Sequence, residues 1–108
     1  MQPDAVHKAS ILLKAVCNEQ RLQVLCQLLD GEKSVGELER AVGLSQSALS
    51  QHLARLRRDN LVRTRRMAQS IFYSLNGIEA RVLIDTLYDL YCSPASPGKE
   101  AMAAGVGE

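Results

Sequence analysis

Three cysteines, Cys17, Cys26 and Cys92, are the residues of this sequence best suited to covalent chemistry. A thiol can be oxidised, can bind a soft metal, or can fill a small apolar site in a core. The three are odd in number and widely spaced, and they form no C-x-x-C pair, which argues against a structural zinc finger. On the residues alone, burial as small apolar side chains is the simpler interpretation.

A second chemical feature is the concentration of arginine between Arg40 and Gln69. This segment holds seven arginines and one acid, Asp59, so its net charge is +6, whereas the rest of the chain sums to −5. The total charge of +1 conceals this asymmetry. Such a segment favours a polyanion as partner, although a solvated surface would give the same count.

The class of protein is narrowed by length and by what the sequence lacks. A chain of 108 residues favours one small domain, which often needs a partner subunit for stability. No apolar run approaches the roughly 20 residues that span a bilayer, and the N-terminal "MQPDAVHKAS" lacks the layout of a signal peptide. We expect a cytoplasmic protein with reduced thiols. The sequence shows no His–Cys arrangement that would activate a nucleophile, so we expect no enzyme.

The elements that must position these residues follow from periodicity. Apolar spacing predicts helices at about 4–16, 18–30, 34–42, 45–60 and 76–92. Residues 61–66 and 71–75 are rich in β-branched and aromatic side chains and predict a hairpin with its turn at 67–70. Ser34 with Glu37, and Asn76 with Glu79, are predicted capping boxes. Residues 93–108 lack periodicity and contain Pro and Gly, which predicts a disordered tail.

The order of a short helix, a turn at Gly43, a capped helix and a hairpin is that of a winged helix-turn-helix. The fold class expected is therefore mainly α with a small β-hairpin. We assign residues 1–92 to one domain for DNA binding and dimerisation. An adaptor winged helix that binds protein is the alternative, but it would not need the basic segment.

The second helix of this motif has two distinct faces. At about 100° per residue, its three core leucines share one face, Leu49, Leu53 and Leu56. The opposite face begins with Ser and Gln, which can bond base edges, and ends with Arg, which can bind phosphates. A generic amphipathic surface helix is the other explanation. The predicted DNA-binding residues on this helix and on the hairpin are Gln46, Ser47, Ser50, Gln51, His52, Arg55, Arg63, Arg65, Arg66 and Gln69.

The segment "SVGELERAVGLSQSALSQHLARLRRDNLV" resembles the DNA-binding core of the ArsR/SmtB-type winged-helix repressors. The resemblance extends from about Leu12 to Cys92. It implies a homodimer built from the first and last helices, which binds a pseudo-palindromic site in double-stranded DNA. The last helix supports a dimer independently, because its many apolar residues exceed what a small monomer leaves exposed: Val82, Leu83, Ile84, Leu87, Tyr88, Leu90 and Tyr91.

Many members of this family sense metals, and the resemblance allows their sites to be checked. The thiolate site of the arsenic and cadmium sensors needs a cysteine at the start of the third helix, where this chain has Ser34. The zinc site on the last helix needs histidines, and residues 77–92 contain none. We therefore expect no metal and no cofactor.

The placement of two cysteines, in "RLQVLCQLLDGE" and "LYDLYC", is similar to a sulfide- and redox-sensing branch of the family. That resemblance implies that Cys26 and Cys92 form a sensor oxidised by reactive sulfur (persulfide) or oxygen species, which lowers affinity for the operator. At least one of the two thiols should be partly exposed with a depressed pKa. Cys17 lies outside the pair. With the other two it could form a three-thiolate site, so an arsenite- or metal-responsive repressor stays open as the alternative.

Overall fold

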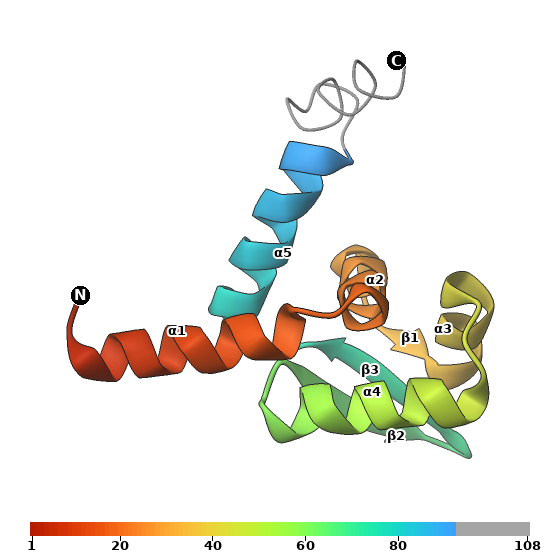
Figure 1. The fold of residues 1–108 in the computed structure, drawn as a ribbon. Helices are drawn as coiled ribbons and strands as arrows, with labels where there is room; N and C mark the ends of the chain where they lie inside the picture. Colours follow the sequence, from red (N-terminus) through yellow and green to blue (C-terminus); the bar gives the residue numbers. More distant parts are fainter. Residues whose placement is uncertain (93–108) are drawn as a thin grey trace, which may run out of the picture.

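The computed structural model describes residues 1–92, and Figure 1 shows the arrangement of the elements. The predicted tail, residues 93–108, lies outside the described residues. The elements in chain order are α1 (Pro3–Val16), α2 (Glu19–Gln27), a 3-10 helix η1 (Leu28–Asp30), β1 (Lys33–Ser34), α3 (Val35–Val42), α4 (Gln46–Arg58), β2 (Val62–Met67), β3 (Ser70–Leu75) and α5 (Ile78–Tyr91).

Helix α2 occupies the centre of the core. It contributes Val24 and Leu25, both fully buried, and it packs against α3, α4 and α5. The three leucines predicted to share one face of α4 are all buried, and Ile84 brings α5 into the same cluster. Because α2 contacts both α4 and α5, it joins the helix-turn-helix to the C-terminal helix.

The helix-turn-helix forms as its local sequence predicts. Ser34 caps α3 through a complete capping box with Glu37, and the backbone hydrogen bond from Ser34 lowers the pKa of the Glu37 carboxyl. Gly43 ends α3 with φ at 68°, a left-handed conformation that favours glycine. Ser45 then accepts a hydrogen bond from the Ala48 N–H and caps α4.

The hairpin is the wing of the fold, and it is more regular than the sequence indicates. Strand β2 pairs with β3 in register from Val62 opposite Leu75 to Met67 opposite Ser70. The turn is therefore two residues long, not the four predicted, because the pairing of Met67 with Ser70 continues the ladder. Strand β1 was not predicted, and it pairs antiparallel with β3 to give a three-stranded sheet of order β1-β3-β2.

The predicted capping box at Asn76 is wrong. The N-cap of α5 is Gly77, at φ 86°, and it makes no side-chain cap hydrogen bond. Asn76 lies one residue before the cap, and its side-chain amide donates to the carbonyl of Asn60 at 3.0 Å. The amide is thus engaged across the base of the wing instead of in the first turn of α5.

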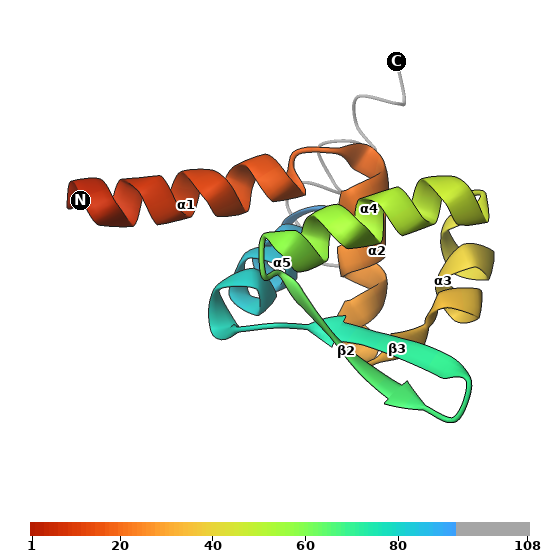
Figure 2. The same ribbon diagram turned by 90° about the horizontal axis from the view of Figure 1, so that it is seen from below.

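Helix α1 extends away from the body formed by α2, α3, α4 and the wing (Figures 1 and 2), and α5 extends from that body after its contact with α2 (Figure 1). Both carry large apolar side chains that are exposed in the single chain: Val6, Ile11 and Leu13 on α1, and Ile78, Val82, Tyr88, Leu90 and Tyr91 on α5. Within residues 1–92, no helix has the length and apolar character needed to cross a membrane.

Candidate nucleic-acid interface

The outer face of α4 presents short polar side chains at its N-terminal end. Gln46, Ser47, Ser50 and Gln51 are all exposed, as predicted from the helical periodicity. The opposite face holds the buried leucines, which fix the rotation of the helix about its axis. Amide and hydroxyl groups in these positions can bond base edges in a major groove.

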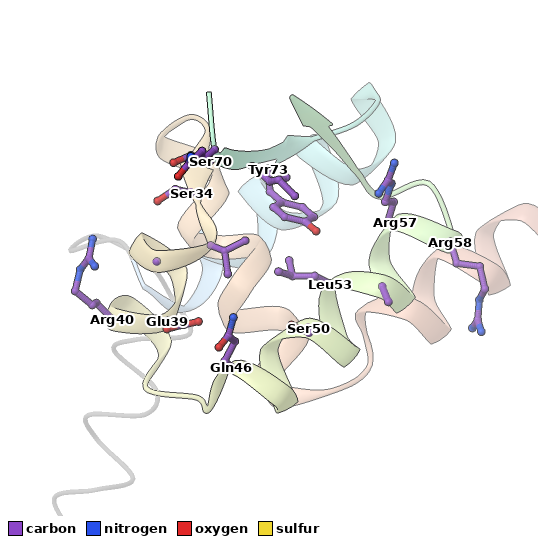
Figure 3. Close-up of a pocket in the computed structure, with 15 residues that line it drawn as sticks. Ser34, Glu39, Arg40, Gln46, Ser50, Leu53, Arg57, Arg58, Ser70 and Tyr73 are labelled. Carbon is purple, nitrogen blue, oxygen red and sulfur yellow. The ribbon is translucent and has the colours of Figure 1, made fainter. Parts of the chain in front are cut away.

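A groove of about 1090 Å³ lies between α3, α4 and the wing (Figure 3). Three predicted DNA-binding residues line it: Gln46 and Ser50 from α4, and Gln69 from the turn of the wing. Its wall also includes Arg57 from α4 and Tyr73 from β3. Arg57 belongs to the basic segment but is not among the predicted DNA-binding residues. The run "RLRR" at the end of α4 was the available signal for Arg57. The other predicted residues do not line this groove.

The wing arginines divide between two faces of the sheet. Strand alternation places Arg66 on the face of β2 that carries buried Val62, and places Arg63 and Arg65 on the opposite face. Arg63 donates to the hydroxyl of Ser74 at 3.3 Å. The three predicted arginines of the wing are therefore not equivalent.

Arg65 has the most extensive contacts of the three. Its guanidinium is paired with the carboxylate of Glu32, with Nε 3.2 Å from Oε2 and a second bond from Nη2 to Oε1, and it lies 5.3 Å from the centroid of the Phe72 ring. The hydrogen bond from Arg65 lowers the pKa of Glu32, and the same contact raises the pKa of Arg65. Glu32 precedes β1, so the pair joins the wing to the loop before that strand.

The C-terminal end of α4 carries an ion-pair cluster. Asp59 accepts a hydrogen bond from Arg55 at 3.0 Å, and Arg58 lies 3.7 Å from its other oxygen. The Arg58 side chain is 69% exposed, against 37% for Arg55, so Arg58 is the freer of the two to meet a phosphate. His52, also predicted to contact DNA, lies in the middle of α4 and is half-buried.

The three thiols occupy different environments. Cys26 is half-buried on α2, whereas Cys92 is exposed at the end of α5. Burial raises the pKa of the Cys26 thiol, and the neighbouring charge of Cys92 raises that pKa further. The expected depressed pKa is therefore not found at Cys26. Helix α2, which bears Cys26, packs against α5, which has Cys92 as its C-cap.

Cys17 belongs to a different helix from either of these two thiols. It is exposed at the C-cap of α1, beside Arg21, which donates to the carbonyls of Ala15 and Lys14. Among residues 1–92, no three His, Cys, Asp or Glu side chains gather as a group that could hold a metal ion.

Comparisons with known proteins place this chain among bacterial regulators. The family described as "Bacterial regulatory protein, arsR family" matches residues 18–64. The transcriptional activator HlyU of Vibrio cholerae is 61% identical over 85 residues, which cover 79% of each chain. The biofilm growth-associated repressor of Xylella fastidiosa is 44% identical over 82 residues, or 76% of this chain and 72% of the repressor.

Solved structures give the same result for the fold. Reduced HlyU from V. cholerae matches with a TM-score of 0.81 at 58% identity, over 83% of this chain and 95% of that chain. The homodimeric winged helix-turn-helix domain of Mb0332 from Mycobacterium bovis matches with a TM-score of 0.71 at 27% identity, over 78% of each chain. The mainly helical winged fold and the expectation of a non-enzymatic regulator are confirmed. The chain belongs to the arsR family of bacterial regulatory proteins and is a DNA-binding transcriptional regulator.

Proposed function

We propose that this regulator is a homodimeric repressor whose operator affinity falls when Cys26 and Cys92 are oxidised by reactive sulfur or oxygen species. The single observation that carries this proposal is the packing of α2, which bears Cys26, against α5, which has Cys92 as its C-cap. The rise in the pKa of Cys26 caused by the charge of Cys92 agrees with it. Crosslinking two residues of one chain requires that their sulfur atoms meet, and the contact between α2 and α5 supports this.

The DNA side of the proposal assigns different tasks to helix and wing. The exposed polar residues at the start of α4 enter the major groove and bond base edges. The groove between α4 and the wing accommodates a sugar-phosphate strand, with Arg57 on its wall. Arg66 and Gln69 bind backbone or minor groove from the wing. Arg63 donates to Ser74 only through Nε, so its other guanidinium N–H groups can bind phosphate, whereas Arg65 would bind phosphate in competition with Glu32.

The dimer is assigned to the exposed apolar faces of α1 and α5. These faces are too extensive for a lone small domain, and a second copy of the chain is the partner that would cover them. The related domain of Mb0332 is homodimeric. For two copies of α4 to enter major grooves on one face of the duplex they must lie about 34 Å apart, or a multiple of it, and the two-fold symmetry of the dimer makes the operator a pseudo-palindrome.

The redox step begins at Cys92, which is exposed, and ends at Cys26, which is half-buried. The Cys92 thiolate attacks the terminal sulfur of a persulfide, RSSH, and the thiol RSH leaves. The Cys26 thiolate then attacks the Cys92 persulfide, expelling H₂S and closing a disulfide. Two thiols are oxidised by two electrons, and one persulfide is reduced to RSH and H₂S. Additional persulfide would leave inserted sulfur atoms in the crosslink.

The crosslink would act on DNA binding through the helices it joins. Cys26 is on α2, which packs against α4, and Cys92 ends α5, which carries the dimer face. A disulfide between them changes how α5 sits on α2, and therefore the relative placement of the two α4 helices in the dimer. Couplings of about 5- to 150-fold in affinity are typical of allosteric proteins.

The decisive experiment measures affinity for an operator, selected from randomised duplexes by the reduced protein, in the reduced, disulfide and persulfide-treated states. We expect both oxidised states to bind more weakly. Cys26→Ser and Cys92→Ser should bind normally and lose the response, whereas Cys17→Ser, the matched control, should keep it. If Cys17→Ser also abolishes the response, or if arsenite releases DNA as well as persulfide does, the three-thiolate metalloid repressor replaces this proposal.

A further inference from the structure

In addition to the packing through α2, a pair of hydrogen bonds from one asparagine joins the end of α4, the helix proposed to enter the major groove (the recognition helix), to the start of α5. Asn76 lies between the end of β3 and Gly77, the N-cap of α5. Its side-chain Nδ2 donates to the carbonyl of Asn60 at 3.0 Å, and its backbone N–H donates to the carbonyl of Leu61 at 2.9 Å. The side chain and the backbone of Asn76 thus hold two successive carbonyls, those of Asn60 and Leu61, across the base of the wing.

The accepting residue belongs to the end of α4. The N–H of Asn60 donates to the carbonyl of Arg57 at 3.1 Å, and the N–H of Leu61 donates to Leu56 at 2.9 Å. Asn60 has φ at 63°, a left-handed conformation that asparagine tolerates better than most residues. This turn ends the recognition helix, so whatever holds its carbonyl also holds the last turn of α4.

The hydrogen bonds from Asn76 to Asn60 and Leu61, called the Asn76 link below, have the packed core on one side and a cavity on the other. Leu61, Val62 and Leu75 are each at most 5% exposed, so the first pair of the wing is fixed in the core. On the side facing α1, the link borders a cavity of about 430 Å³ that Asn60, Asn76 and Ala80 all help to line. This side leaves room for a shift at the start of α5, and the two hydrogen bonds of Asn76 would pass such a shift to the turn that ends α4.

We propose that Asn76 is a positioning residue that transmits movement of α5 to the recognition helix through its side-chain hydrogen bond to the Asn60 carbonyl. This inference rests on the proposed regulator in one respect, namely that α5 moves when its end is crosslinked. The alternative is that Asn76 only closes the base of the hairpin. If Asn76 transmits movement, loss of its side-chain bond reduces the effect of oxidation on operator affinity. If Asn76 only closes the hairpin, its loss lowers stability and leaves that effect unchanged.

The informative variant is Asn76→Asp, which keeps the shape and the backbone N–H but replaces the amide donor by a carboxylate. A negative charge next to the N-terminus of α5 favours that helix, so the variant should fold. Asn60→Gly is the matched control, because glycine keeps both the left-handed turn and the accepting carbonyl. Ser74→Ala, two residues away on β3, removes a hydrogen bond that does not join α4 to α5.

The first readout is the ratio of operator affinities in the reduced and disulfide states. We expect Asn76→Asp to bind as the unchanged protein does when reduced, with the ratio falling toward one, while both controls keep the full ratio. A variant that keeps the full ratio but has a lower Tm would overturn the inference, because Asn76 would then only close the hairpin.

The second readout needs no oxidant, so it separates failure of this inference from failure of the redox switch. Operator binding holds α4, and transmission through Asn76 should slow amide hydrogen exchange in the first turns of α5 in the unchanged protein and in both controls. The slowing should be absent in Asn76→Asp. If DNA leaves α5 exchange unaltered in the unchanged protein, the link transmits nothing. If the slowing occurs but oxidation has no effect on affinity, only the redox proposal fails.

Discussion

The guanidinium of Arg65 is paired with the carboxylate of Glu32, 33 residues earlier in the chain. Both side chains are partly exposed, so the pair contributes little to stability and can exchange partners. The position of Arg65 on the wing also suits it to bind DNA phosphate. Glu32 and a phosphate would then compete for the same guanidinium.

This competition predicts opposite effects of two substitutions. Glu32→Gln should raise the affinity for every duplex, because the carboxylate no longer holds Arg65. Arg65→Ala should lower affinity for every duplex and reduce the slope of log affinity against log salt by about one. Titration of a specific and a non-specific duplex over a range of salt measures both. If neither variant changes binding, Arg65 serves only to hold the wing to the loop before β1.

The pairing of Arg65 also shows where sequence reasoning reached its limit. The capping box of α3, the leucine face of α4 and the hairpin depend on neighbours within a few residues, and local patterns predicted them. The Arg65–Glu32 pair, the two-residue strand β1 and the Asn76–Asn60 bond join segments that are distant in sequence. No local pattern encodes such contacts, because each requires the wing to be already placed against the core.

The same limit applies within the candidate site. The sequence predicted which face of α4 is exposed, since that follows from a 3.6-residue period and the buried leucines. It did not separate Arg57, on the groove wall, from Arg55, which is held by Asp59, because that distinction depends on where the wing lies.

Base contacts and backbone contacts should respond differently to substitution. The four polar residues at the start of α4 are replaced one at a time by alanine: Gln46, Ser47, Ser50 and Gln51. Each substitution should reduce the difference in binding free energy between the operator and its mutated forms by roughly 1–3 kcal/mol for each good hydrogen-bonded base contact that is lost. Competition binding with single-base-pair operator variants measures this. A weaker affinity with unchanged discrimination would show that these residues bind the backbone.

Arg57→Ala and Arg66→Ala should behave in the other way. Each should weaken binding to all duplexes and lower the salt slope by about one for each phosphate that is no longer neutralised, leaving sequence preference unchanged. Arg81→Ala, an exposed arginine on α5, is the matched control and should leave the slope unaltered. If Arg57→Ala or Arg66→Ala changed the preferred operator sequence, that arginine would contact bases and not the phosphate backbone.

A charged substitution on the exposed face of α5 tests the dimer. Val82 is 53% exposed in the single chain, and Val82→Glu would place a charge in the interface proposed for α1 and α5. We expect a monomer at concentrations where the unchanged protein is a dimer, with weaker operator binding. Met67→Glu is the matched control, because this side chain on the wing has a similar exposure. The molar mass of this variant, measured by analytical ultracentrifugation, should remain that of the dimer. A dimeric Val82→Glu would place the interface elsewhere.

The coupling of Cys26 and Cys92 makes a prediction about pH. Burial raises the pKa of Cys26, and the charge of Cys92 raises it further, so Cys26 becomes a thiolate only at a higher pH than an ordinary cysteine. Cys92→Ser removes the like charge. The pKa of Cys26 should then fall toward its usual value, yet stay above it because burial remains. In terms of rate, Cys26 should react faster with an alkylating reagent at a given pH below its midpoint.

Alkylation of Cys26 followed by mass spectrometry over a pH series measures this shift directly. Cys17→Ser is the matched control, because the charge of Cys17 is not a cause of the raised pKa and its removal should leave the midpoint of Cys26 where it was. A midpoint that stays fixed in Cys92→Ser would mean that the two thiols do not influence each other in solution. The geometric basis of the proposed crosslink would then be gone, whatever the effect of oxidants on DNA binding, since a disulfide within one chain requires the two sulfur atoms to meet.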